Sequence, residues 1–265
     1  MRFQITLSLI GSDQVLPFNY QYEMQAWIYK IFQQANPAFA SFLHEVGYSA
    51  AHSAKRFKLF CFSNLYVSQS KRLPEGLRVL CPTVSFYIGF YTDQAVETFV
   101  QGLFMHQEGS IGNAKHRIQF VVSAVEAMSL QLAGDEATLK TLSPLVISRN
   151  NERGYEDYLN PQEDKEDYLH LFINNLVDKY AASGHSIPVS WQDFPFALDL
   201  IGNRAPTSKL ITLKANTEKA EQIKGYHFAF RLTAPQALIQ LGLLAGFGAQ
   251  NAQGFGFCKE KAPQS

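Results

Sequence analysis

A tyrosine and a histidine early in the chain are the first residues whose types and positions could support chemistry. Tyr29 falls in an expected helix over residues 20–35, roughly 140° around the helix from its apolar stripe. His44 falls in the last turn of a second short helix, where the helix dipole favours an imidazolium ion. Both side chains are therefore expected to point away from the core, and a protonated histidine can serve as a general acid. A surface tyrosine and a helix-capping histidine without any catalytic role would give the same sequence pattern, so the pattern alone leaves that alternative open.

A basic segment follows these two residues. Lys55, Arg56 and Lys58 surround Phe57, and Lys71-Arg72 comes next along the chain. Cations with an interleaved aromatic ring offer phosphate contacts together with a surface on which a base can stack. The alternative is a solvated strand edge, where lysine protects against aggregation. Because Lys+Arg 23 balance Asp+Glu 23, any nucleic-acid site must be a local patch of this kind.

A glycine-rich stretch close to the C-terminus is the sharpest motif in the sequence. Its glycines follow the spacing G-x-G-x5-G-x-G, at Gly246, Gly248, Gly254 and Gly256. Glycines permit positive φ angles and a close approach of the main chain, whose N–H groups can bind a phosphate. The spacing is neither a dinucleotide-binding fingerprint nor a phosphate-binding P-loop. The alternative is a plain turn between a helix and a strand; if the loop binds phosphate, the main-chain amides of these glycines would contact a nucleic-acid backbone.

The remaining chemistry-bearing residue types show no organised pattern. The other histidines are scattered without metal-ligand spacing, and no serine or cysteine nucleophile motif is present, so we expect no metal and no cofactor. Three cysteines without a CxxC spacing are expected to be reduced and buried. No apolar run has the length of a membrane span and the start of the chain reads as a strand, which together predict a cytoplasmic protein with no membrane partner.

Hydrophobic periodicity predicts an α+β fold made of two similar halves. In the first half, the expected order is strand, helix, helical turn, strand, strand, helix, strand. The second half is expected to contain strands at 138–148, 208–215, 225–233 and 255–259, with helices at 163–182 and 235–244. Both orders correspond to the βαββαβ unit of a ferredoxin-like domain. We therefore predict tandem ferredoxin-like domains over residues 1–130 and 131–265, the second containing the glycine-rich loop.

Several short segments, in order along nearly the whole chain, resemble the CRISPR-associated endoribonucleases of the RAMP superfamily, which cut repeat RNA into guide units. The matching segments are Met1-Arg2-Phe3, Gln21-Tyr22, Trp27-Ile28-Tyr29, Leu43-His44-Glu45-Val46, Lys58-Leu59-Phe60, Phe62-Ser63-Asn64-Leu65, Leu142-Ser143-Pro144-Leu145 and the glycine-rich loop. The resemblance implies metal-independent cleavage, in which a 2′-hydroxyl attacks its own phosphodiester and leaves a 2′,3′-cyclic phosphate and a 5′-hydroxyl.

The resemblance also implies roles for particular residues. It maps the catalytic tyrosine, histidine and lysine of such enzymes onto Tyr29, His44 and Lys58. The stretch from 47 to 57 is longer than in the shortest relatives, and it brings in His52, Lys55 and Arg56 as rivals for the base and the cation. An in-line displacement needs a proton acceptor, a proton donor and a cation at the phosphate, so the residue types agree with the chemistry.

Two other functions remain open at the level of the sequence. One is a non-catalytic subunit of a CRISPR effector complex that binds repeat RNA. The other is a protein-interaction module without RNA, which the zero net charge favours mildly. Repeat RNA is the expected partner, effector subunits are further candidates, and the sequence leaves a homodimer open.

The basic segment should make RNA binding sensitive to salt. Each phosphate of a single strand that the protein neutralises adds about 0.7 to the slope of log K against log salt. Replacing Lys55, Arg56 and Lys58 together by alanine should lower that slope, measured by RNA-binding titrations from low to high salt. A slope that does not change would place the RNA elsewhere on the protein.

Overall fold

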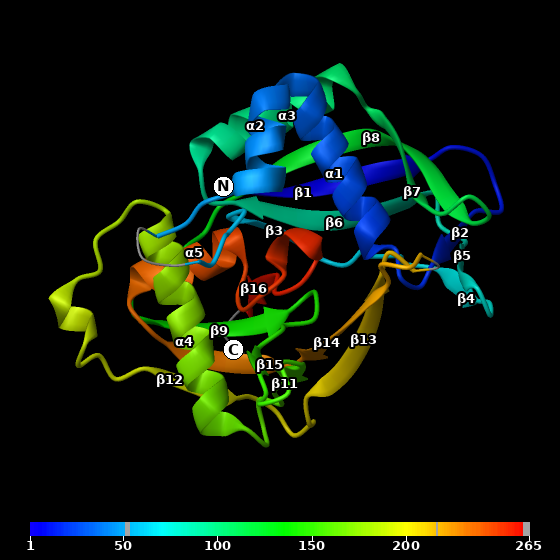
Figure 1. The fold of residues 1–265 in the computed structure, drawn as a ribbon. Helices are drawn as coiled ribbons and strands as arrows, with labels where there is room; N and C mark the ends of the chain where they lie inside the picture. The colour runs from blue at the N-terminus through cyan, green and yellow to red at the C-terminus, as the bar shows by residue number, and fades with distance from the viewer. Residues whose placement is uncertain (51–53, 216, 262–265) are drawn as a thin grey trace.

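The computed structural model describes residues 1–50, 54–215 and 217–261, and in it two halves of mixed helix and strand lie one above the other (Figure 1). The first half contains, in chain order, β1 (Arg2–Leu9), β2 (Val15–Pro17), α1 (Gln21–Ala35), α2 (Pro37–Ser41), the π-helical turn η1 (Phe42–Val46), β3 (Phe60–Phe62), β4 (Ser70–Arg72), β5 (Gly76–Val79), β6 (Thr83–Phe90), α3 (Asp93–Met105), β7 (Glu108–Gly112) and β8 (Arg117–Met128).

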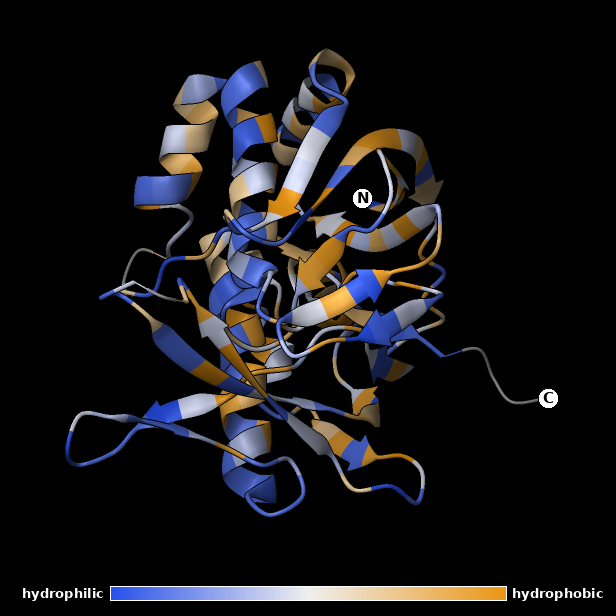
Figure 2. Cartoon of the chain, turned by 90° about the vertical axis from the view of Figure 1, so that its right-hand side faces the viewer, coloured by the Kyte–Doolittle hydropathy of each residue, from blue (hydrophilic) through white to orange (hydrophobic). Residues whose placement is uncertain are grey.

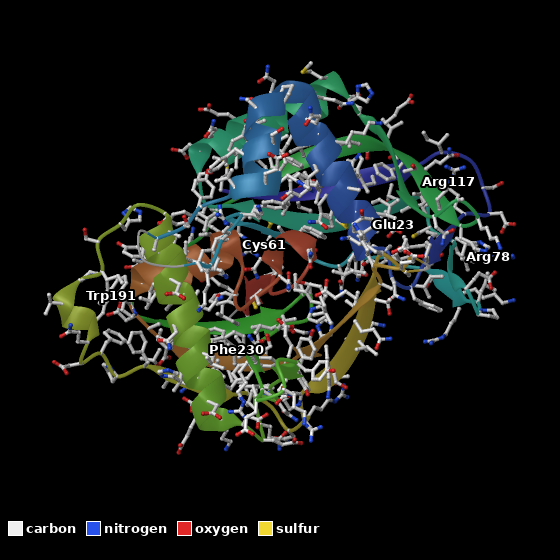
Figure 3. All side chains as sticks on the ribbon, in the orientation of Figure 1. Glu23, Cys61, Arg78, Arg117, Trp191 and Phe230 are labelled. Carbon is white, nitrogen blue, oxygen red and sulfur yellow. The ribbon has the colours of Figure 1, made fainter. Side chains whose placement is uncertain are left out.

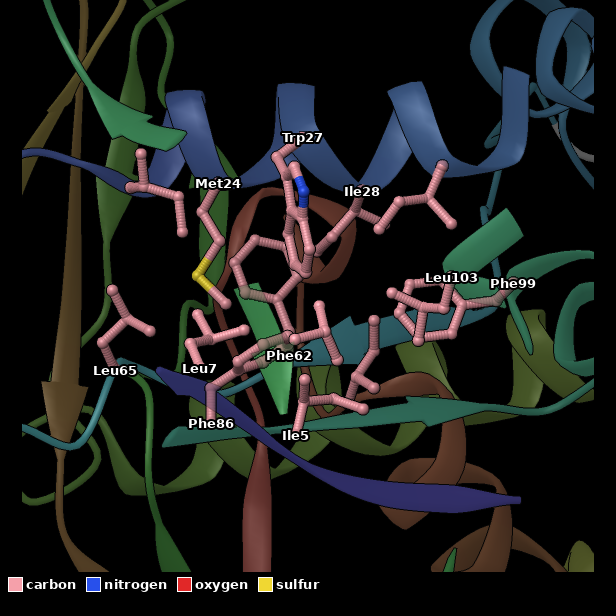
Figure 4. Close-up of a cluster of buried hydrophobic side chains, with 14 of the residues drawn as sticks. Ile5, Leu7, Met24, Trp27, Ile28, Phe62, Leu65, Phe86, Phe99 and Leu103 are labelled. Carbon is pink, nitrogen blue, oxygen red and sulfur yellow. The ribbon is translucent and has the colours of Figure 1, made fainter. Parts of the chain in front are cut away.

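The main sheet of the first half is antiparallel, in the order β3-β6-β1-β8-β7. Without the added edge strand β7, this is the strand order of a ferredoxin-like unit. Apolar and polar residues alternate along these strands, as the orange and blue bands of Figure 2 show. The apolar side chains meet α1 and α3, and Figure 4 shows Trp27 of α1 reaching down to the sheet beside Phe86. Those two rings lie edge to face with centroids 6.0 Å apart, so the predicted amphipathic helix is confirmed.

The second half repeats this arrangement. It contains, in chain order, β9 (Glu136–Thr141), β10 (Ser148–Asn150), β11 (Glu156–Tyr158), α4 (Lys165–Ala182), the 3₁₀ turn η2 (Val189–Trp191), β12 (Ala197–Leu200), β13 (Thr207–Leu213), β14 (Glu221–His227), β15 (Ala229–Thr233), α5 (Gln236–Ala245), the 3₁₀ turn η3 (Asn251–Gln253) and β16 (Cys258–Glu260). Its sheet has the order β12-β15-β9-β16, which again matches a ferredoxin-like unit. The predicted class, α+β with tandem ferredoxin-like folds, is confirmed.

Three expectations for the second half differ from the structure. The strand expected at 208–215 is β13, which pairs with β14 in a separate hairpin, and the sheet takes β12 in its place. The strand expected at 225–233 is divided at Phe228 between β14 and β15. The strand expected at 138–148 stops at Thr141, because the main chain then leaves the sheet and Leu145 makes a single bridge to Tyr226. Local β propensity cannot distinguish a sheet strand from a hairpin strand.

The last helix and the glycine-rich loop lie between the two sheets (Figure 1). The fit is close, because a Cβ added to Gly89 of β6 would lie 2.7 Å from the Leu244 carbonyl oxygen of α5. Cys61, which Figure 3 shows in the middle of the molecule, is fully buried and directs its thiol at the same carbonyl. Arg2 joins the two ends of the chain by donating a 2.5 Å hydrogen bond to the Cys258 carbonyl oxygen. The first and last strands therefore meet at the contact between the halves, and the three cysteines are buried and unpaired as expected.

Within the described residues, no helix combines the length and the apolar composition needed to cross a membrane.

The contact between α1 and α3 predicts that one glycine cannot be replaced by alanine. A glycine-to-alanine change inside a helix usually stabilises it by about 1 kcal/mol. At Gly102, however, the added Cβ would lie 2.3 Å from the Ile31 carbonyl oxygen. Gly102→Ala should therefore lower the free energy of unfolding by about 1–3 kcal/mol in urea denaturation. The neighbouring change Gln101→Ala, on the exposed side of the same helix, is the control and should have almost no effect. A stabilised Gly102→Ala protein would contradict the packing of these helices.

Candidate active site

The turn that carries His44 is fixed at both ends. Asn36 caps α2, with its side-chain oxygen accepting a 3.0 Å hydrogen bond from the Phe39 N–H. The helix then widens into the π-helical turn η1, which ends at Gly47 with φ +66°. A Cβ at that position would lie 2.7 Å from the Phe57 carbonyl oxygen, so only glycine lets the basic segment approach so closely. His44 is exposed on this turn.

Arg56 and Lys58 are placed against the same turn. Lys58 Nζ donates a 3.0 Å hydrogen bond to the His44 carbonyl oxygen, and Arg56 donates one of 3.2 Å to that of Val46. These bonds satisfy carbonyl groups that the end of a helix leaves without partners. Partial burial, and secondarily the positive charge of Arg56, lowers the pKa of Lys58. Two cations of the segment predicted to bind RNA thus also hold the main chain that carries the histidine.

Tyr29 completes the group from the side of α1. Its ring meets the His44 ring edge to face, with centroids 5.8 Å apart. The expectation that Tyr29 points away from the core is wrong, because its ring also packs edge to face against the buried rings of Phe32 and Phe60. Burial raises the pKa of Tyr29 to about 12, so its phenol keeps its proton near neutral pH and can act as a donor. The structure therefore brings together the three residues that the resemblance singles out, although they come from a helix, a turn and an irregular segment.

A cavity of about 420 Å³ opens beside Tyr29, between the two halves. The basic segment forms one wall, with Lys55, Arg56 and Lys58, and Tyr29 stands next to it. The end of α4 and the glycine-rich loop form the opposite wall, which runs from Gly248 to Gln253. The basic segment and the glycine-rich loop, about 190 residues apart in the sequence, thus face each other across one cavity.

The rivals proposed for the catalytic roles have different surroundings. Lys55 forms a 2.7 Å ion pair with Asp178 of α4, which ties the basic segment to the second half of the chain. His52 lies outside the described residues. Tyr48, just after η1, and Phe57 of the basic segment exchange two backbone hydrogen bonds of 2.7 Å.

The glycine-rich loop is a tightly packed structure, and its four glycines are all buried with positive φ. The N–H groups of Gly246, Gly254 and Gly256 donate to carbonyl groups inside the loop or next to it. Among the described residues, that of Gly248 has no hydrogen-bond partner, and Gly248 lines the cavity. Of the four glycine amides predicted to contact RNA, this one is thus available without breaking a bond within the protein.

Sequence reasoning missed the residue that organises this loop. Lys179 of α4 is buried, and its ammonium group donates to three acceptors in the loop: the carbonyl oxygens of Gly246 and Gly248 and Asn251 Oδ1, at 2.6, 2.7 and 2.6 Å. Asn251 in turn donates from Nδ2 to two further carbonyls of the loop. The sequence does hold a signal, because Lys179 follows Phe172 and Leu176 at spacings of four and three on the buried face of the helix.

No cluster of three or more histidine, cysteine, aspartate or glutamate side chains that could bind a metal occurs in the part of the chain that the structure describes.

Sequence comparison matches both halves of the chain to one family. Residues 15–126 match the family described as CRISPR-associated protein Cas6, N-terminal, and residues 128–260 match its C-terminal counterpart. The CRISPR-associated endoribonuclease Cas6 of Pyrococcus furiosus is 27% identical over 98% of this chain and 89% of its own. Cas6 1 of Methanocaldococcus jannaschii is 28% identical over 97% of this chain and 91% of its own.

The fold is also similar to solved structures. A Cas6-related protein from Pyrococcus furiosus superposes with a TM-score of 0.81 at 22% identity, covering 100% of this chain and 99% of the other. At this identity the superposition establishes the shared fold.

The packing of the loop predicts that Gly248→Ala will destabilise the protein. The residue has φ +66°, and an added Cβ would lie 2.3 Å from the Val146 carbonyl oxygen. Thermal or urea unfolding should show a loss of about 2–4 kcal/mol, the sum of the clash and the left-handed conformation. Gly154→Ala is the matched control, since Gly154 has φ +79° with open space around it, and it should lose only about 1–2 kcal/mol. Equal losses at the two positions would show that the loop can yield to a side chain.

Proposed function

The chain belongs to the CRISPR-associated Cas6 family, and on that premise we propose that it is an endoribonuclease that cuts CRISPR repeat transcripts into guide RNAs. The single observation that carries the assignment of its active site is the convergence of Tyr29, His44 and Lys58 at the edge of a basic cavity. In this arrangement an RNA strand lies between the basic segment and the glycine-rich loop. The scissile phosphate reaches the rim, where the three side chains meet.

The proposed reaction is an intramolecular displacement at phosphorus. The oxygen of the 2′-hydroxyl attacks the adjacent phosphorus and loses its proton, while the bond from phosphorus to the 5′-oxygen breaks and that oxygen gains a proton. The products are a 2′,3′-cyclic phosphate and a 5′-hydroxyl, and no water is consumed. The protein has to align the attacking and leaving oxygens, transfer protons and stabilise the charge that builds on the other phosphate oxygens.

Each of the three residues fits one of these tasks. His44 is the main proton-transfer group, because its side chain is exposed and histidine is the commonest general acid or base in enzymes. Tyr29 keeps its phenolic proton, so it orients the attacking hydroxyl through a hydrogen bond and does not act as a phenolate base. Lys58 supplies a positive charge at the phosphate, and its bond to the His44 carbonyl fixes the distance between cation and imidazole.

The binding partners follow from the same proposal. Repeat RNA is the substrate, with Lys55, Arg56 and the Gly248 amide as contacts to its backbone. The remaining glycines, Gly246, Gly254 and Gly256, shape the loop that presents this amide. We place the reaction in the cytoplasm and include CRISPR effector subunits and a second copy of the chain among candidate partners.

A non-catalytic RNA-binding subunit is the second candidate function. One observation favours it: His44 is not among the residues that line the cavity proposed to hold the RNA, so binding does not require the imidazole. Cleavage assays separate the two candidates directly, since a binding subunit would retain intact RNA.

Replacing His44 by alanine should slow single-turnover cleavage of repeat RNA by about 10²–10⁴-fold, the usual contribution of a general acid or base. RNA affinity should change little, because the loss is confined to the transition state. Tyr29→Phe should cost less than His44→Ala if the phenol only orients the 2′-hydroxyl. Quenched-time-course gels with enzyme in excess over RNA give both rates.

The substrate provides the controls. Cleavage should persist in EDTA, and the product should carry a cyclic phosphate. An RNA with hydrogen in place of the 2′-hydroxyl at the cut site should bind and remain uncut. Full activity of His44→Ala, or cutting of the deoxy substrate, would refute the mechanism. Loss of activity in His52→Ala with an active His44→Ala protein would transfer the role to the rival histidine, and binding without any cleavage would favour the second candidate.

A further inference from the structure

A buried lysine without an acidic partner stands at the floor of the proposed RNA site. Lys179 has 2% of its surface exposed, and it lines the cavity between the two halves. Its three hydrogen-bond acceptors, two main-chain carbonyls and one amide oxygen, are all neutral. Buried cations are normally paired with a carboxylate, because desolvation of an unpaired charge is costly. The protein therefore holds a positive charge that nothing among the described residues neutralises.

The groups around Lys179 include one carboxylate, that of Asp178, and it already forms an ion pair with Lys55. On its own helix, Asp178 pairs with Lys55, and Tyr180 is uncharged. The basic segment presents Arg56 and Lys58, which add to the positive potential. Burial keeps the thiol of Cys61 and the phenol of Tyr29 neutral, with the pKa of each raised to about 12. The glycine-rich loop has no titratable side chain.

Only the protonated form of the lysine can donate to all three acceptors at once. An ammonium group has three N–H donors, and each acceptor lies 2.6 or 2.7 Å from Nζ. A neutral amine has two N–H donors, so deprotonation would leave one of the three acceptors without a partner. Both of the carbonyl acceptors belong to the loop that forms one wall of the cavity. The protonation state of Lys179 and the conformation of that wall are thus linked.

We propose that Lys179 is a positioning residue that couples RNA binding to proton uptake: a phosphate in the cavity stabilises its ammonium form, and the ammonium holds the glycine-rich loop in the conformation that receives the RNA. This inference rests on the proposed function, because it takes RNA as the anion. It assigns Lys179 no contact with the reacting atoms.

The sign of the effect follows from linkage. Desolvation lowers the pKa of Lys179 to about 7 in the free protein, so at pH 8 most molecules carry the neutral amine. A bound phosphate favours the charged form and raises this pKa, so RNA binding takes up a proton at pH 8 and almost none at pH 6. By the same linkage, RNA affinity falls as pH rises from 7 to 8.5, by at most about tenfold per pH unit.

Calorimetric titrations in pairs of buffers with different ionisation enthalpies measure the proton uptake directly. The RNA is a synthetic single strand with the sequence of the CRISPR repeat next to the gene. The protein is the His44→Ala variant, which is expected to slow cleavage and which removes the imidazole from the titration. We expect uptake to rise from close to zero at pH 6 to about one proton per RNA at pH 8.

Two variants on this background attribute the proton. Lys179→Met should abolish the uptake at pH 8 and flatten the pH dependence of affinity. Arg56→Met, which removes a charge from the same cavity and leaves the Lys55–Asp178 ion pair in place, is the matched control and should weaken binding while leaving the uptake intact. Circular dichroism reports whether each variant is folded.

Lys58→Met serves as a further test that does not depend on the stability of a Lys179 variant. It removes the other cavity lysine whose pKa is lowered, and it retains Lys179. Uptake at pH 8 should persist in Lys58→Met. RNA binding without uptake in that variant, or undiminished uptake in a folded Lys179→Met protein, would overturn this inference and leave the proposed function standing. Failure of the repeat RNA to bind at all would overturn both.

Discussion

The three hydrogen bonds of the Lys179 ammonium are the interaction on which the architecture of the cavity depends. They connect the last turn of α4 to the loop that follows α5. The next residue back along α4, Asp178, holds the basic segment of the first half. One helix end therefore fixes both walls of the cavity. The glycines make this possible, since a Cβ at 246 or 256 would collide with Asn251 and one at 248 would collide with the Val146 carbonyl oxygen.

At the rim of the cavity, the side chains that stabilise the turn η1 also belong to the proposed reaction site. Lys58 and Arg56 cap the carbonyl groups at the end of η1, and in doing so they place two cations next to His44. The π-helical turn ends at Gly47 with positive φ, a conformation that glycine adopts without strain. Its effect is to let the basic segment lie against the turn, and a rigid position for the imidazole is what proton transfer requires.

The order of helices and strands could be predicted from the sequence where each element buries one face against a single sheet, because that burial determines the spacing of its apolar residues. The strand expected at the start of the chain and the helix expected over residues 20–35 both correspond to real elements, β1 and α1. The pattern failed where pairing depends on distant partners. Residues 207–213 have strand-forming side chains, yet they pair with β14 in a hairpin, while the less distinctive β12 joins the sheet. Which neighbour a strand finds is decided by tertiary packing, which a short window of sequence does not contain.

For the candidate site, the sequence indicated which residue types could react, whereas the fold determines their distances and orientations. Tyr29, His44 and Lys58 could be named from their positions off the apolar stripes and from the resemblance, but the 5.8 Å approach of the two rings follows from the packing of three separate elements. Lys179 was overlooked for a physical reason: a lysine on an apolar helix face is usually taken to extend its stem along the surface and keep its charge in water. Here the charge goes inward instead, where the carbonyl groups of a glycine-rich loop substitute for water. A loop first interpreted as a source of N–H donors for phosphate thus turns three of its oxygen acceptors toward a cation of its own protein. The positive charge beneath the cavity and the Gly248 amide at its wall both favour an anion in the same space, one through its long-range field and the other through a directed hydrogen bond.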